Sequence, residues 1–264
     1  SLYALYWCCG KVFRIDLNPK HFISDDEDKN QPFTLNAFEF ADLGQRRFYE
    51  PPTFTIHKSG MTRYAVLSMG SGDRSSPLRS SQVNDLLVGL YDYGVTQRTP
   101  SAQATILEGN LREIYKSQKQ TADHKGWYYV LPKQSVESET YQSRIIEEGV
   151  ALDNDLYMAI FDPRNSTAGE NATSCTGGIT GESTLYKFCL PDGDCGASKT
   201  SVDKVGKLGA GILGLTVGPG SKDDHRTFIF NQPPNPKPDE YVTANKLLPK
   251  KWFEYSPYKA KSNK

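Results

Sequence analysis

Two apolar runs separated by a glycine-rich turn constrain the fold of this chain more than any other feature. The run 64–69 stops at the sequence Gly-Ser-Gly-Asp-Arg of residues 70–74, and the run 86–91 stops at Asp92. Glycine adopts positive φ at little steric cost, and Asp and Ser bond to nearby backbone, so such clusters end strands. The segment therefore predicts a strand, a glycine-rich turn, a loop and a second strand that ends in an acidic residue.

This unit recurs along the chain at irregular spacing. Segments 10–17, 155–162 and 183–190 are short apolar and aromatic runs that end near an Asp or at a turn. Repeated strand units are typical of a β-propeller, in which every blade follows the same path. We predict an all-β, β-propeller-like fold, partial or modified, and the alternative is a large β-sandwich of unrelated strands.

The composition supports one large β-domain and argues against two classes of protein. The 264 residues include 15 Tyr, 12 Phe, 22 Gly and 16 Pro, which favours twisted strands with many turns. Basic and acidic residues balance at 31 each, whereas proteins that bind nucleic acid usually carry a basic excess. No apolar run approaches the roughly 18 residues of a transmembrane segment. Because the chain begins at Ser1, we expect a fragment of a longer protein, and the missing signal peptide says nothing about export.

The segment 101–122 departs from the strand pattern. It has apolar residues at helical spacing, interrupted by Gly109, and predicts one short helical insertion, in one or two pieces. The apolar positions are Ile106, Leu107, Leu111, Ile114 and Tyr115. Further strands are predicted at 126–131, at 143–162 with a turn at 153–155, and at 212–217. We expect a propeller-like domain over 1–230, followed by a proline-rich linker and a basic, aromatic segment over 231–264 that packs on the surface.

The five cysteines indicate a disulfide. Cys175, Cys189 and Cys195 lie in one loop-rich segment without zinc-like spacing, so two of these three are expected to pair, which implies an oxidising compartment. Cys8 and Cys9 are adjacent in an aromatic strand. Buried thiols and a bond to a partner outside this fragment are both open for them.

Three motifs resemble ligand sites but have simpler interpretations. We interpret Gly70, Gly72, Asp73 and Arg74 as a structural turn, because a phosphate loop would carry Lys-Ser/Thr where Asp73 stands. Residues 209–214 match the pattern Gly-x-Gly-x-x-Gly, but the Gly-Pro-Gly sequence that follows prevents the helix that a dinucleotide-binding site needs. The acidic run 25–28 is expected to be a solvated loop, with weak surface calcium as the alternative. No histidine cluster or catalytic triad can be named from spacing.

The order of these motifs resembles the C-terminal propeller region of the PilC/PilY family of type IV pilus tip-associated adhesins and biogenesis factors. The similar segments are the strand 10–17, the extended segment 47–52, the turn 70–74 with Pro77, the strand 85–92, the Gly-Trp-Tyr strand at 126–128 and the Cys-Gly-rich loop from Cys175. They cover roughly residues 10–217. The sequence departs from the family at 138–141, and no calcium loop precedes Gly10.

The resemblance implies an extracellular, non-enzymatic module at the pilus tip or outer membrane surface of a bacterium. Its partners would be minor pilins and host-cell or abiotic surface receptors, contacted through the loops 163–183, 189–195 and 24–30. No cofactor is expected in this fragment, and calcium is possible in the full-length protein. The alternative is a quinoprotein-like propeller dehydrogenase, although Trp7, Trp127 and Trp252 do not follow its docking motif. A glycoside hydrolase would need a paired-carboxylate cleft, which sequence alone does not reveal.

Overall fold

The computed structural model describes residues 2–6, 10–18, 32–95, 97, 103–116, 121, 123–136, 138–164, 180–196, 201–219, 225–229 and 240–242. Several predictions lie outside these residues. They concern the acidic loop 24–30, the pair Cys8 and Cys9, the part 165–179 of the long loop with Cys175, the proline-rich linker 231–239 and the tail beyond 242.

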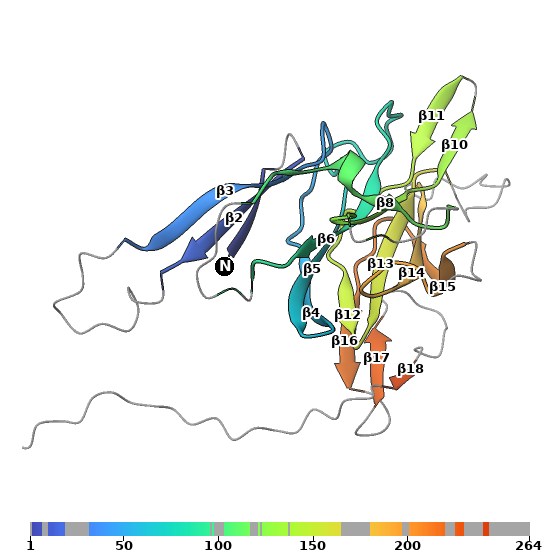
Figure 1. Cartoon of the computed structure of the whole chain (residues 1–264). Coiled ribbons are helices and arrows are strands. Elements are labelled where there is room, and N and C mark those ends of the chain that lie inside the picture. The colour runs from blue at the N-terminus through green and yellow to red at the C-terminus, as the bar shows by residue number, and fades with distance from the viewer. Residues whose placement is uncertain are drawn as a thin grey trace, which may run out of the picture.

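The described residues form five sheets whose strands mostly follow chain order, as expected for a propeller-like fold (Figure 1). Sheet A has the order β1-β2-β3-β7 and contains β1 (Leu2–Tyr6), β2 (Lys11–Leu17), β3 (Thr34–Asp42) and β7 (Ile106–Leu107). Sheet B has the order β4-β5-β6-β9-β8 and contains β4 (Thr53–Ser59), β5 (Thr62–Gly70), β6 (Leu86–Asp92), β8 (Arg112–Glu113) and β9 (Gly126–Val130).

Three further sheets complete the architecture. Sheet C is the hairpin of β10 (Lys133–Val136) and β11 (Glu139–Gln142), which projects from the body in Figure 1. Sheet D contains β12 (Val150–Leu152), β13 (Asp155–Asp162), β14 (Glu182–Cys189) and β15 (Asp203–Ala210). Sheet E contains β16 (Thr216–Pro219), β17 (His225–Ile229) and β18 (Glu240–Val242). The all-β, propeller-like prediction is confirmed. The strands expected at 10–17, 64–69, 86–91, 126–131, 155–162 and 183–190 correspond to β2, β5, β6, β9, β13 and β14, whereas the strand expected from residue 143 begins only at Val150.

Sheet B lies between two hydrophobic layers, and its strand alternation shows why. Along β6, Leu86, Val88 and Leu90 face the cluster shared with sheet A, whereas Leu87 and Tyr91 face the cluster shared with sheet D. Because side chains alternate across a strand, a strand covered on both faces must be apolar at consecutive positions. Every residue of β6 is buried. The apolar run 86–91 is therefore the central strand of a layered core.

The segment 103–116 differs from the helical expectation. Its helix is a single 3-10 turn, η2 (Glu108–Asn110), flanked by the two-residue strands β7 and β8. Ile106, Leu111 and Ile114 are buried, but Leu107 is 52% exposed, so the apolar positions do not form one helical face. The short helical insertion predicted at 101–122 is confined to this single turn, because β7 pairs in parallel with β3 and β8 with β9, which holds the segment extended on both sides of the turn.

Two features near the end of the chain also differ in detail from expectation. The strand predicted at 212–217 begins only at Thr216, because Gly211 takes a positive φ of 88° after β15 and Ile212 to Leu215 run without strand pairing. Within the segment expected as linker and tail, Glu240–Val242 forms β18 and pairs antiparallel with β17.

Candidate functional site

The turn at 70–74 is held by contacts within the protein. A Cβ on Gly70 would lie 2.3 Å from the Ile145 side chain, so the close approach requires glycine. Asp73 accepts hydrogen bonds from Arg47 Nη1 at 2.9 Å and from the Ser75 backbone N–H at 3.0 Å. Arg74 forms an ion pair with Glu50 at 2.7 Å. These contacts fit a structural turn, in which the carboxylate of Asp73 itself binds the neighbouring N–H groups.

A buried arginine holds the loop between β5 and β6 through its backbone oxygens. Arg144 is almost fully buried and donates hydrogen bonds to the backbone oxygens of Ser76 and Arg79. Ser71 Oγ donates to Asp85 Oδ1 at 2.7 Å, and it also accepts the backbone N–H of Leu86 at 2.8 Å. Burial raises the pKa of Asp85 and lowers that of Arg144. The loop is therefore a rigid part of the scaffold.

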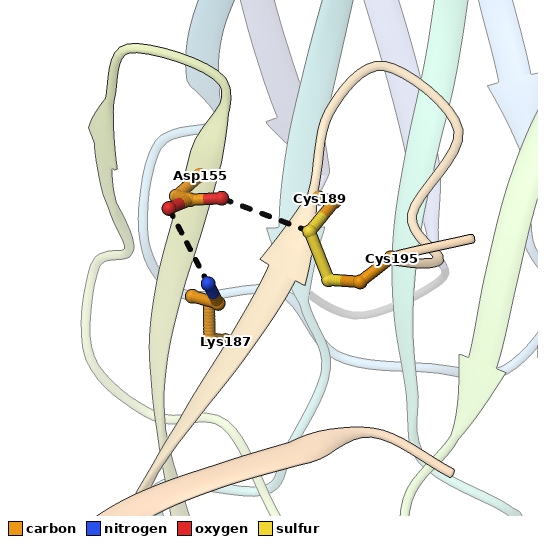
Figure 2. The surroundings of a disulfide bond; sticks show 4 residues. All are labelled: Asp155, Lys187, Cys189 and Cys195. Carbon is orange, nitrogen blue, oxygen red and sulfur yellow. Dashed lines mark hydrogen bonds and ion pairs between the residues drawn. A yellow bond between two sulfur atoms is a disulfide. The ribbon is translucent and has the colours of Figure 1, made fainter. Parts of the chain in front are cut away.

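A disulfide closes the loop that follows β14. Cys189 and Cys195 are bonded, with their Cα atoms 4.9 Å apart (Figure 2). Asp155, on the neighbouring strand β13, forms an ion pair with Lys187 at 3.5 Å and lies 3.7 Å from Cys189 Sγ, which has no proton to donate in a disulfide. We call residues 189–195 the Cys-closed loop. Cys175, the third pairing candidate, lies outside the described residues.

The Cys-closed loop is docked on the indole ring of Trp127 in the central sheet. Trp127 Nε1 donates to the backbone oxygen of Pro191 at 2.7 Å. A Cβ on Gly193 would lie 2.4 Å from the indole, and one on Gly89, on the opposite β6 strand, would lie 2.3 Å from it. The ring is therefore enclosed between two glycines. Since Gly193 also has a positive φ of 83°, both its space and its backbone conformation favour glycine.

A buried arginine fixes the other end of the same loop. Arg112 forms an ion pair with Asp194 at 2.7 Å and donates to the backbone oxygen of Asp192 at 2.8 Å. The Tyr91 hydroxyl lies 3.2 Å from Asp192 Oδ1, to which it donates. The disulfide, Trp127, Arg112 and Tyr91 together hold the loop in one conformation, and the side chain of Asp192 remains exposed at its tip.

Aromatic side chains flank the loop on the side of Asp192. Tyr64 stacks on Tyr93 with ring centroids 4.8 Å apart, and it meets Tyr91 edge to face at 5.5 Å. Burial raises the pKa of Tyr64 to about 12, and the negative charge of Asp192 acts in the same direction. Burial lowers the pKa of His57, whose ring lies 6.1 Å from that of Tyr64, and Asp192 opposes this shift. We call His57, Tyr64, Tyr91 and Tyr93 the tyrosine cluster.

A second aromatic pair lies near Asp194 of the Cys-closed loop. Tyr115 and Tyr129 meet edge to face with centroids 6.1 Å apart, beside a cavity of about 550 Å³ that Asp203 and Lys204 also line. Tyr115 has a positive φ of 61°, which is uncommon for an aromatic residue. Burial raises the pKa of Tyr115 to about 12, with Asp194 and Asp203 adding to the shift. Two groups of tyrosines therefore lie near acidic residues of the Cys-closed loop.

Sequence reasoning missed a buried charge cluster between sheets A and B. Arg14, Asp16 and Asp92 are essentially unexposed. Arg14 Nη1 lies 2.7 Å from Asp92 Oδ1 and 2.8 Å from Asp92 Oδ2, and Arg14 Nε lies 2.9 Å from Asp16 Oδ1. The Tyr3 hydroxyl donates to Asp92 Oδ2 at 2.5 Å. The sequence does show an acidic residue at the ends of these strands. However, Arg14 and Asp92 lie 78 positions apart, so their pairing cannot be predicted from sequence spacing.

The described residues present neither a metal cluster nor a membrane-spanning helix. Within the described ranges, no three side chains among His, Cys, Asp and Glu gather closely enough to hold a metal ion. No helix in that part of the chain is long and apolar enough to cross a membrane. Of the four histidines, His57 lies in the tyrosine cluster, and His124 contacts Thr121. His21 lies outside the described residues.

Comparisons with known proteins show a likeness of fold. No protein-family model matches the chain. No curated protein sequence matches it either. Among solved structures, the fold is similar to the C-terminal domain of PilY1 from Pseudomonas aeruginosa, with a TM-score of 0.55 and 13% sequence identity. The match covers 85% of this chain and 54% of that domain's chain, so this chain spans about half the length of its structural neighbour. The chain therefore has a fold like that of the PilY1 C-terminal domain.

Proposed function

We propose that this chain is a non-enzymatic module of a type IV pilus-associated protein, which binds minor pilins at the pilus tip and receptors on host or abiotic surfaces. The observation that carries the proposal is the structural likeness to the PilY1 C-terminal domain over most of this chain. The motif order of residues 10–217 points to the same family.

The Cys-closed loop is the proposed contact surface for a protein partner. It is held by a disulfide, by Arg112 and by Trp127, so little conformational entropy is lost when it binds. Its exposed carboxylate at Asp192 stands next to tyrosines, and tyrosine supplies a large contact area with few rotatable bonds. A disulfide of this kind suits an extracellular location. Calcium binding by the longer protein stays a prediction.

A genetic experiment tests the biological role. Deleting the gene from the source bacterium should abolish piliation or surface attachment, and expression of the unaltered gene should restore it. Normal pili together with normal attachment in the deletion strain would refute the proposal.

A binding experiment tests the proposed contact surface. Purified chain should retain minor pilins, and Asp192→Ala should weaken that retention because it removes the exposed charge at the loop tip. Asp153→Asn is the matched control, since Asp153 is an exposed turn residue with a positive φ of 54° that asparagine also adopts. Equal loss in both variants would place the contact elsewhere.

A third measurement separates this proposal from the dehydrogenase alternative. Purified chain supplied with quinone and calcium should not reduce an electron-accepting dye in the presence of alcohols or sugars. Sustained dye reduction would defeat the non-enzymatic proposal.

A further inference from the structure

A second cavity opens beside the tyrosine cluster, where the end of β6 meets the segment 103–110. It has a volume of about 400 Å³, which lies within the range of small-ligand pockets. The side chains that give it chemical character are Tyr91, Tyr93, Gln103, Thr105, Asn110 and Lys125. It combines aromatic, amide and ammonium groups, and no carboxylate side chain is among its lining residues.

Tyr93 forms a rigid aromatic wall of this cavity. Its ring stacks on Tyr64 at an interplanar angle of 28° and meets the edge of Tyr91 at 82°, yet its side chain remains 39% exposed. Both neighbours are buried parts of the core, so the orientation of Tyr93 is fixed before any ligand arrives. An accessible, pre-oriented aromatic ring is a suitable platform for the apolar face of a sugar ring.

Lys125 supplies the only charged side chain that lines the cavity. Its backbone is held from both sides, because its N–H donates to the Asn110 backbone oxygen at 2.9 Å and its oxygen accepts the Tyr91 N–H at 2.9 Å. The ammonium group has no ion-pair partner among the described residues. A fixed backbone and an unpaired ammonium suit a ligand carboxylate, with which a charge-assisted hydrogen bond can form.

Gln103 adds a polar side chain beside Gly94. Its side chain is half-buried, and within the described part of the chain its amide group makes no hydrogen bond to protein. A Cβ on Gly94 would lie 2.4 Å from Gln103 Nε2 and 2.6 Å from Arg14 Nη1. Glycine at position 94 therefore leaves the space that the Gln103 amide occupies. An amide carries both donors and an acceptor, which matches the hydroxyl groups of a sugar.

We propose that this cavity binds an acidic saccharide, with a hexuronate residue as the recognised unit. The sugar ring lies against Tyr93, its hydroxyl groups bond to Gln103 and Asn110, and its carboxylate pairs with Lys125. The role of this cavity as a receptor site rests on the adhesive function proposed above. Binding of the saccharide does not depend on that function and can be measured on the purified chain. A uronate-bearing polymer from a host surface and one from a bacterial matrix present the same chemistry to the cavity.

The test is a titration of the purified 264-residue chain with three probes. A glucuronate-containing oligosaccharide should bind, the same oligosaccharide with its carboxyl groups reduced to alcohols should bind about three- to tenfold more weakly, and acetate alone should show no saturable binding. Equal affinity for the acidic and reduced sugars would overturn the carboxylate assignment. Absence of binding by the acidic sugar at millimolar concentration would overturn the proposal as a whole.

Variants place the binding in this cavity. Lys125→Met should reduce affinity for the acidic sugar about three- to tenfold and leave affinity for the reduced sugar unchanged. Lys58→Met removes the same charge from an exposed position outside the cavity and is the matched control. Tyr93→Phe should retain binding and Tyr93→Ala should lose it. If Lys58→Met weakens binding as much as Lys125→Met does, the sugar is attracted by the overall positive charge of the protein, and the assignment to this cavity is wrong.

The same experiments distinguish this inference from the function proposed above. A host-derived and a bacterial uronate polymer tested side by side report which source binds better. Weaker binding of the acidic sugar in Lys125→Met with unchanged piliation would support the site and separate it from pilus assembly. Failure of sugar binding with normal pilin retention would overturn the cavity assignment and leave the pilus-associated role standing.

Discussion

Replacing Arg14 with Met should strongly destabilise the packing of sheet A on sheet B. Arg14 is fully buried on β2 and bonds to Asp92 at the end of β6 and to Asp16 on its own strand. The methionine fills a similar space but leaves two buried carboxylates without their cation. Asp92 retains the Tyr3 hydroxyl and the backbone N–H groups of Gly94 and Val95, which stabilise its charge only in part.

The expected loss can be estimated from the burial of the pair. Removing one partner of a buried ion pair typically costs about 3 to 5 kcal/mol, because the remaining charge stays desolvated. Whole domains are stable by only about 5 to 15 kcal/mol, so the variant should lose a large share of its stability. With a urea m-value of about 2.5 kcal/mol/M, a loss of about 4 kcal/mol lowers the unfolding midpoint by roughly 1.5 M.

A double-mutant cycle is the suitable assay. Urea unfolding is followed by tryptophan fluorescence for Arg14→Met, Asp92→Asn and the double variant, and the coupling between the two positions is calculated. The exposed pair of Arg74 and Glu50 serves as the control, and Arg74→Met with Glu50→Gln should show a coupling below about 1 kcal/mol. If Arg14→Met costs less than about 1 kcal/mol, or if its coupling to Asp92 is no larger than that of the control pair, the argument is wrong.

Three further predictions concern other parts of the molecule. Reducing the disulfide between Cys189 and Cys195 should lower stability by about 2 kcal/mol, as expected for a short closed loop, and urea unfolding with and without reductant measures this. Gly89→Ala should destabilise by about 1 to 3 kcal/mol because its Cβ would meet the Trp127 indole, whereas Gly206→Ala, with no atom within 4 Å, should change stability by less than about 0.5 kcal/mol in the same assay. The pKa of His57 is lowered in the folded state by burial, so the unfolded chain binds more protons just below pH 6.5 and stability should fall as the pH drops through that window. His57→Gln should flatten this fall in urea midpoints measured from pH 7.5 to 5, and an unchanged slope would count against the burial argument.

The strands were predictable because their apolar runs are interrupted by strong turn residues. The stretch 86–91 is apolar at consecutive positions since both of its faces are covered, and the sequence alone shows that character. The turn predicted at 153–155 has a similarly local cause, because Asp153 adopts a positive φ that Asp tolerates better than most residues. Local chemistry decides such features, so they do not depend on distant contacts.

The conformation of the segment 106–115 could not be predicted from its sequence. Its helical spacing is real, but pairing of β7 with β3 and of β8 with β9 decides its conformation, and those partners lie elsewhere in the chain. The candidate site was predictable only in its Cys-closed loop. Its docking on Trp127 and Arg112, and the cavity formed by Tyr93 with Lys125, depend on contacts between residues that are remote in sequence.

The short segment that holds β7, η2 and β8 also limits how this protein can change during evolution. One end of it completes sheet A and the other end completes sheet B, so the eight residues 106–113 connect the two sheets. A propeller usually gains or loses blades as whole repeats. Here, excision of either sheet would take a strand from the other, and we therefore expect these two sheets to be inherited together as a single indivisible unit.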